Sequence, residues 1–483
     1  MDASFGGFFL AADTRSINFR RRTINAPNGN SVKADQRSRP GGGFAKLARL
    51  VFLAAGFLSF SVLSYAYDDH ALISYYSLRK DLGDESVRLE TLGEFLVKEQ
   101  VEIARALSEA ELWCRTNLSR YKPLPQELVF AAGGSPADIE TRFLKSIRVD
   151  PEHFRYDYLQ DVGGKLSGKF PGKISDWKEL YLLNWNYHSQ IPFVRIKPRD
   201  IIPAIDVIST ASDIPDYGVD CGLFADNKTA LGGMYGFGNQ PLGDPAKLMH
   251  QQASFHMPYY HDAFLTTVMP NLKSPYAIFR EKYYSEIARV AFKTKHDYWG
   301  YYFAGLALHY VEDCCLPYHV SIVPGSSALQ LLWEILKDKN YIARVIIPRI
   351  SAQHLFLEAY IYNNFIEERN GSKKPYFLDA VNDGFRRGDL SPKNYDMFIV
   401  TVLAKKASDI GGKIAPVIES ITDGPKMGSE ISARTSSGDY YVDDFILPGK
   451  NREKEAFRAQ CYAAVKLAGN GARAYWEEIK KEK

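Results

Sequence analysis

Leu308-His309-Tyr310-Val311-Glu312-Asp313-Cys314-Cys315-Leu316-Pro317-Tyr318-His319 is the most informative stretch of this 483-residue chain. On a helix, residues four apart project from the same face, so His309 and Asp313 are expected to lie side by side. Pro317 is expected to end that helix, which places His319 on the following turn. The stretch therefore predicts an apolar helix that presents an imidazole and a carboxylate together, with a second imidazole close behind.

A second stretch repeats this spacing some forty residues later. Ser351-Ala352-Gln353-His354-Leu355-Phe356-Leu357-Glu358 again puts a histidine and an acid four apart on an apolar helix. One such pair is most often an ion pair on a helix surface. Buried imidazoles and carboxylates, however, cost several kcal/mol unless they are paired or bound to a cation. Two pairs and a third histidine therefore indicate a shared metal, and this mixture of ligands suits zinc.

Helical periodicity dominates the chain after the N-terminal region, and alternation typical of strands is scarce, so we expect an all-α fold. Apolar residues three and four apart predict helices in the following ranges: 85–118 (one or two helices), from Ser135 onward, 277–294, 296–315, 326–338, 351–367 and 453–480. Two stretches rich in Gly, Pro or Ser are expected to be long loops, 221–246 and 420–451. Such loops are often lids or binding loops, and a disordered surface insertion is the alternative for 420–451.

The charge of the chain is distributed unevenly. The formal net charge is +3, but residues 1–64 hold nine Lys or Arg against three Asp, which leaves −3 for residues 65–483. A faintly acidic body does not match the phosphates of duplex nucleic acid, so we expect no stable duplex binding. The hydrophobic fraction of 46% fits a globular protein.

The N-terminal region has the layout of a secretory signal peptide. Residues 50–63 form an uncharged apolar run, preceded by Lys46 and Arg49 and followed by the small residues Ser64 and Ala66. The run is shorter than the roughly 20 residues of a membrane-spanning helix. We therefore expect a leader over residues 1–64 and export of a mature chain that begins at Tyr65 or Tyr67; an uncleaved N-terminal anchor is the alternative.

Cysteine usage gives no metal-binding motif. The chain has five cysteines, and none of their spacings is Cys-x-x-Cys. At most two disulfides can form, and the sequence does not fix their pairing. Cys314 and Cys315 are expected to be a thiol pair, packed or exposed, rather than ligands, because their helix positions turn away from His309 and Asp313.

The two histidine-containing stretches together resemble the signature of the zinc-dependent phospholipase C and S1-P1 nuclease superfamily, closer to its bacterial phospholipase C branch. The shared pattern is His-x-x-x-Asp-x-x-x-x-x-His followed by His-x-x-x-Glu, at His309, Asp313, His319, His354 and Glu358. The resemblance implies an all-helical bundle that holds three zinc ions.

The same resemblance implies further ligands. An early histidine is matched by His70, and an aspartate in Pro-Asp-Tyr is matched by Asp216. A histidine beside an aromatic residue is matched by His256, with His261 as the alternative. The mature N-terminus would also bind zinc; it would be Tyr65 or Tyr67, where the family usually has Trp.

Distributed over three ions, the implied ligands form three sets. The first ion would be bound by Asp216, His256, His309 and Asp313. The second would be bound by the N-terminus at Tyr65, by His70, and by Asp313 as a bridge. The third would be bound by His319, His354 and Glu358.

The resemblance covers about half of the chain. The gap between His70 and Asp216 is much longer than in compact family members, so residues 85–205 are expected to be an inserted helical region within a single zinc-hydrolase-like domain, 65–483.

The function implied is that of an exported zinc-dependent phosphodiester hydrolase, most similar to phospholipase C. Asp216 would be both ligand and general base, and Tyr217 would face a phospholipid head group or, alternatively, pack in the core. Transient contact with a membrane surface and a monomeric state are expected. The alternatives are a single-strand nuclease or 3′-nucleotidase, whose usual Trp-Ala-Asp element is missing here, and a non-catalytic metal-binding surface protein.

Overall fold

The computed structural model describes residues 70–174, 179–180, 190–262, 266, 270–338, 341–384, 397–436 and 441–483. Contacts divide the chain into units of residues 1–47 and 48–483, and the described residues all belong to the second unit. The predicted leader and the candidate N-terminal residues Tyr65 and Tyr67 lie outside the described residues. Within the described part, no helix is long and apolar enough to cross a membrane.

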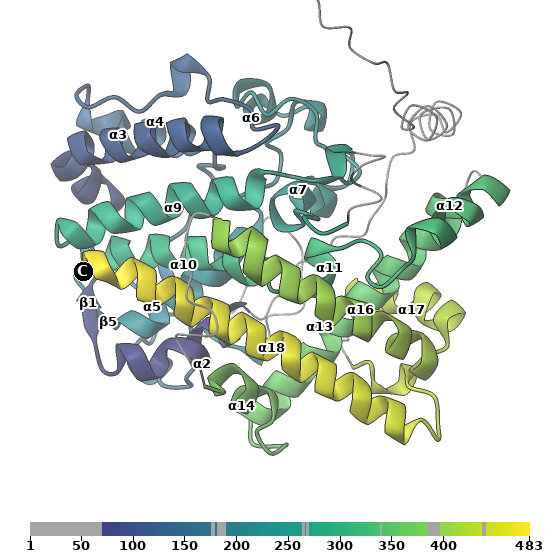
Figure 1. The fold of residues 1–483 in the computed structure, drawn as a ribbon. Helices are drawn as coiled ribbons and strands as arrows, with labels where there is room; N and C mark the ends of the chain where they lie inside the picture. The colour runs from purple at the N-terminus through teal and green to yellow at the C-terminus, as the bar shows by residue number, and fades with distance from the viewer. Residues whose placement is uncertain are drawn as a thin grey trace, which may run out of the picture. The chain divides into compact units, whose positions relative to one another are not determined.

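The described part of the chain is mostly helical, which confirms the all-α class (Figure 1). The longer helices are α2 (His70–Leu82), α3 (Leu92–Asn117), α5 (Ala204–Asp213), α9 (Tyr276–Lys293), α10 (Asp297–Asp313), α12 (Ala328–Lys337), α13 (Ile347–Arg369), α16 (Ala404–Ile421), α17 (Gly424–Ser436) and α18 (Asn451–Ile479). Shorter helices are α4 (Ile139–Ser146), α6 (Ala230–Met234), α7 (Ala253–His256), α11 (Pro317–Val320) and α14 (Phe377–Asn382). The helices expected over 277–294, 296–315, 326–338, 351–367 and 453–480 are therefore all present.

Two small antiparallel sheets lie in the region expected to be a helical insertion. The first pairs β1 (Ser86–Arg88) with β5 (Ile201–Pro203), and the second has the order β2 (Tyr158–Gln160), β4 (Phe193–Arg195), β3 (Lys173–Ile174). Residues 85–205 are thus mixed in structure rather than purely helical, and α3 begins only after β1. Strands of two or three residues are too short to show an alternating pattern in the sequence.

Two expected boundaries are wrong. Residues 420–451 are not one loop, because α17 occupies much of this range and buries Met427 and Ile431. Helix α10 ends at Asp313, and Pro317 starts the next helix, α11, instead of stopping the first one. Proline is well suited to this position, since the first turn of a helix needs no hydrogen bond from its backbone nitrogen.

Helix α10 is the central element of the described fold. It packs against α9, α5 and α18, and all of its residues from Tyr298 to Asp313 are buried. The contact with α5 is close because residue 305 is glycine: a Cβ there would lie 2.4 Å from the carbonyl oxygen of Ile208 and 2.6 Å from Cβ of Ala211. This close approach sets the distance between α10 and the segment that directly follows α5, Ile214–Tyr217.

We expect Gly305→Ala to destabilise the fold by about 1–3 kcal/mol, because the added methyl group forces α5 and α10 apart. Denaturant unfolding measures this change. Gly233→Ala is the matched control, since Gly233 is also helical and has open space around its missing Cβ. Alanine favours helices over glycine by up to about 1 kcal/mol, so the control should be neutral or slightly stabilising. Equal stability of the two variants would contradict the packing argument.

Candidate metal centre

Eight of the nine predicted metal ligands lie in the described part of the chain, and the structure brings all eight together. They come from six separate elements. His70 is the first residue of α2, Asp216 lies in the 3-10 helix Ile214–Tyr217, and His256 ends α7. The others lie on α10 (His309 and Asp313), α11 (His319) and α13 (His354 and Glu358).

These side chains form three groups, each of which could hold a metal ion. Group A is Asp216, His256 and His309; group B is His70, His309 and Asp313; group C is His319, His354 and Glu358. Within each group the candidate ligand atoms lie within 4.8 Å of one another, and every member is buried. The prediction that scattered imidazoles and carboxylates converge in space is therefore confirmed.

Group A gains a fourth ligand atom from Asp313. Nδ1 of His256 lies 2.7 Å from Nε2 of His309 and 3.3 Å from Oδ1 of Asp216. Oδ2 of Asp313 lies 3.3 Å from Nδ1 of His256 and 3.2 Å from Nε2 of His309. Two nitrogens and two carboxylate oxygens therefore surround one buried position.

Asp313 connects the groups to one another. While Oδ2 faces group A, Oδ1 lies 3.7 Å from Nε2 of His70 in group B. The same Oδ1 lies 2.8 Å from Nδ1 of His319, whose other nitrogen belongs to group C. The two oxygens of Asp313 thus face groups A and B, the two that Asp313 was expected to bridge, and the contact with Nδ1 of His319 links it to a residue of group C.

Group C lies nearest to solvent. Nε2 of His319 is 3.1 Å from Nε2 of His354 and 3.2 Å from Oε1 of Glu358, and the last two atoms are 2.6 Å apart. The side chain of Glu358 is 9% exposed, compared with 3% or less for the other seven ligands. Glu358 is thus the least buried of the eight ligands.

Three of the imidazoles have their second nitrogen held by an oxygen acceptor. Nδ1 of His309 donates to the carbonyl of Ser212 at 2.8 Å, and Nδ1 of His319 donates to the carbonyl of His256 at 3.0 Å. Nδ1 of His70 donates to Oε2 of Glu312 at 2.8 Å. With the proton on Nδ1, the lone pair of Nε2 points into the group, which is the arrangement found around metal-ligating histidines.

Neighbouring imidazoles keep the carboxylates of Asp313 and Glu358 ionised. Burial alone would raise the pKa of Asp313, but the imidazoles of His309 and His319 hold it well below its usual value. The pKa of Glu358 is likewise lowered despite its burial, first by His354. Burial and the neighbouring His309 lower the pKa of His70. These three side chains are thus in the protonation state that binds a cation.

The pKa of His319 shifts in the opposite direction to that of His70. Burial would lower its pKa, but the carboxylate of Asp313 raises the pKa of His319 to about 9. A metal ion in group C therefore has to compete with a proton on this imidazole.

The structure decides between the two candidate histidines near residue 260. Nε2 of His261 donates to the carbonyl of Val400 at 2.8 Å, away from the three groups. His256 is the one that joins group A.

The expectation that Tyr217 faces a head group is wrong in this arrangement. Tyr217 is 3% exposed, and its hydroxyl donates to Oδ2 of Asp213 at 3.0 Å. The 3-10 helix turns adjacent side chains to different sides, so Asp216 points into group A while Tyr217 packs behind it. The alternative, core packing, is what the structure shows.

Two further histidines pair with acids away from the three groups, and the cysteines are free thiols. His153 pairs with Asp150, and His296 contacts Glu90 and Glu99, while His188 lies outside the described residues. All five cysteines are free and buried, so Cys314 and Cys315 form a packed pair. The described chain therefore gains no stability from disulfides.

Two supporting carboxylates were not identified from the sequence. Glu312 accepts hydrogen bonds from His70 and from the hydroxyl of Ser74, both at 2.8 Å. Asp220 accepts from Nε of Arg280 at 2.9 Å, and its Oδ2 lies 3.7 Å from Nε2 of His256. The only signal for Glu312 was a second acid on the apolar helix that carries His309; its partner, His70, is 242 residues away.

The buried Arg280 connects the site to the inserted region. Its guanidinium also donates to the carbonyls of Ile147 at 2.6 Å and Arg148 at 2.8 Å. The backbone just after α4 is thereby tied, through Asp220, to the surroundings of His256.

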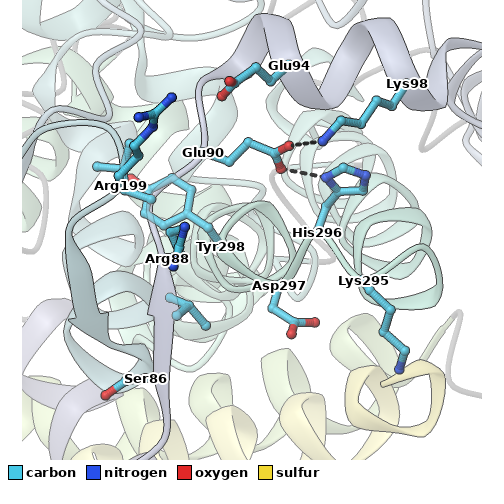
Figure 2. Close-up of a pocket in the computed structure, with 12 residues that line it drawn as sticks. Ser86, Arg88, Glu90, Glu94, Lys98, Arg199, Lys295, His296, Asp297 and Tyr298 are labelled. Carbon is cyan, nitrogen blue, oxygen red and sulfur yellow. Dashed lines mark hydrogen bonds and ion pairs between the residues drawn. The ribbon is translucent and has the colours of Figure 1, made fainter.

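A separate cavity of about 450 Å³ lies at the other end of α10 (Figure 2). Glu90 lies there between Lys98, at 2.9 Å, and His296, at 2.5 Å. Twelve residues of helix, about 18 Å, separate Asp297 at this cavity from His309. Charges of both signs line the cavity, and it is not part of the three groups.

We expect Glu312→Ala to weaken metal binding about 10- to 100-fold, because His70 loses the acceptor that fixes its ring and its tautomer. Glu312→Gln keeps one acceptor oxygen and should lose less. Competition against a chromophoric chelator measures the affinity. Glu281→Gln is the control: Glu281 is also buried, but it accepts from Ser285 on α9 and contacts none of the ligands. Unchanged affinity in Glu312→Ala would exclude a supporting role for Glu312.

Comparisons with known proteins do not identify a family for this chain. The chain matches no model of a protein family, no curated protein and no solved structure. What the site does must therefore be argued from the ligands and their surroundings.

Proposed function

We propose that this chain is a zinc-dependent phosphodiester hydrolase of the phospholipase C kind, which cleaves head groups from phospholipids. The observation that carries the proposal is the convergence of three buried ligand groups around one bridging carboxylate, Asp313. The order of these ligands along a mostly helical chain supports a phospholipase C/P1 nuclease-like fold.

Zinc fits group A in both chemistry and size. Zinc bonds to imidazole nitrogen and carboxylate oxygen are about 2.0–2.2 Å long, so the corners of a tetrahedron of such ligands are roughly 3.3–3.6 Å apart. The five separations among the ligand atoms of group A and Asp313 run from 2.7 to 3.6 Å, with four of them between 3.2 and 3.6 Å. Calcium and magnesium prefer oxygen ligands, which makes these histidine-rich groups unsuited to them.

Zinc ions clustered in this way would supply positive charge for an anionic phosphodiester and would lower the pKa of a bound water toward neutrality. The chain itself positions the groups that handle protons. Oδ1 of Asp216 faces group A, and Oδ2 lies 3.8 Å from Nε2 of His70. A carboxylate placed between two groups is suited to receive the proton of the attacking water, so we assign Asp216 as ligand and general base.

The geometry also implies how the metal content should respond to substitution. We expect about three zinc ions per chain in the parent protein. Glu358→Ala should retain about two, because it disrupts group C alone. Asp313→Ala should retain about one, because Asp313 contributes to groups A and B. Elemental analysis of the purified proteins measures this. His296→Ala is the control, because His296 is a buried histidine paired with two glutamates outside the groups. Equal loss in both ligand variants, or loss in the control, would contradict the assignment.

The reaction is tested with one zinc-loaded sample on two substrates. We expect release of phosphocholine from phosphatidylcholine, and a decrease of about 100-fold or more in Glu358→Ala, because several kcal/mol of charge stabilisation are removed. Release of nucleotides from single-stranded DNA is measured alongside. Activity on DNA alone would favour the nuclease alternative, and a zinc-loaded chain inactive on both would favour a non-catalytic metal-binding protein.

A further inference from the structure

Helix α12 exposes a row of large apolar side chains. Leu329 is 73% exposed, Trp333 is 61% exposed and Leu336 is 48% exposed. Their spacing of four and then three residues puts them on one face of the helix. This face presents an indole and two leucines directly to solvent.

The opposite side of α12 is also apolar. Leu331 and Ile335 are 6% and 4% exposed, so they are buried while the first face is not. Between the two apolar faces runs a polar stripe of Gln330, Glu334 and Lys337, which are also spaced by four and three residues. A row of three large exposed apolar side chains, bordered by polar residues, is typical of a surface that contacts a partner or a membrane.

The position of α12 relates this face to the metal groups. The chain runs from α11, which carries His319, through α12 to α13, which carries His354 and Glu358. The segment that contains α12 therefore starts and ends at residues of group C. Group C also contains Glu358, the ligand with the most exposed side chain. In Figure 1, α12 extends outward beyond α11 and α16.

The charges around α12 complement anionic lipid head groups. Residues 325–349 carry four Lys or Arg against two acids, a balance of +2 in a chain whose residues 65–483 sum to −3. Two of these cations are well exposed, Arg344 at 70% and Lys337 at 52% of their side chains, and each pairs with an acid of the same segment, Asp338 at 2.7 Å and Glu334 at 3.2 Å. Nζ of Lys337 lies 5.1 Å above the ring of Trp333. Tryptophan with lysine at the edge of an apolar face is typical of helices that lie in the membrane interface.

We propose that α12 docks on the surface of a phospholipid bilayer, with Leu329, Trp333 and Leu336 in the interfacial layer, and so brings group C to the head groups. Ten residues are too few to span a bilayer, so the helix lies in the interface rather than crossing it. The proposal rests on the proposed function for its substrate, but it concerns binding, which can be measured without turnover.

Binding is tested by sedimentation of the full chain with vesicles of phosphatidylcholine and phosphatidylglycerol. The Glu358→Ala background limits lipid turnover. We expect the triple variant Leu329→Ser/Trp333→Ser/Leu336→Ser to partition about tenfold or more less onto the vesicles. The matched control is Val101→Ser/Leu112→Ser on α3, where both side chains are 65% exposed, and its partitioning should stay within about twofold of the parent. Equal partitioning of triple variant and parent would overturn the proposal.

The hydrolysis readout separates failure of docking from failure of the proposed function. With wild-type Glu358, the triple variant should keep its activity on a short-chain phosphatidylcholine dissolved as monomers and lose it on vesicles. Equal activity of triple variant and parent on vesicles would overturn the docking proposal alone. Vesicle binding that depends on α12, without hydrolysis of either substrate, would support docking and refute the proposed function.

A second copy of the chain is the competing occupant of this face. Sedimentation velocity of the parent and the triple variant, without lipid, distinguishes the two. A monomeric parent supports the membrane as partner. A parent dimer that the triple variant abolishes, together with vesicle binding that does not depend on α12, would overturn it.

Discussion

Imidazole lone pairs and carboxylate oxygens face one another in a volume from which water is excluded, and this arrangement governs the rest of the structure. The ring nitrogens of His256 and His309 are 2.7 Å apart, with carboxylate oxygens on both sides. Gathering such groups away from solvent is costly unless a cation lies between them. The scaffold has to supply enough stability to hold them there, and a bound metal would return part of that cost as folding stability.

The fold holds this arrangement with rigid helices and a layer of supporting acceptors. Gly305 lets α10 approach α5 closely, and one turn later Nδ1 of His309 donates to Ser212 at the end of α5. Glu312 fixes His70 in the same way from the side of α10. The helices thus set not only the positions of the imidazoles but also the nitrogen that each one presents.

The three groups differ in how deeply their ligands are buried. All members of the three groups are buried, and Glu358 of group C has the most exposed side chain, at 9%. The connection that carries α12 begins and ends at the helices of group C. If α12 docks on a membrane as proposed, group C is the group that this connection would bring toward the head groups.

The sequence by itself determined the local features of this protein. A spacing of four residues on apolar helices placed His309 beside Asp313 and His354 beside Glu358, and periodicity located α9, α10, α13 and α18, because both depend only on the helical repeat. The resemblance to a zinc-hydrolase signature added His70, Asp216 and His256 to the set that converges. The sequence missed the short strands and α17, whose Gly- and Ser-rich composition hides its buried residues. Only the tertiary structure chose His256 over His261, turned Tyr217 inward and paired Glu312 with His70, since these outcomes depend on packing between segments up to 242 residues apart, which no local pattern encodes.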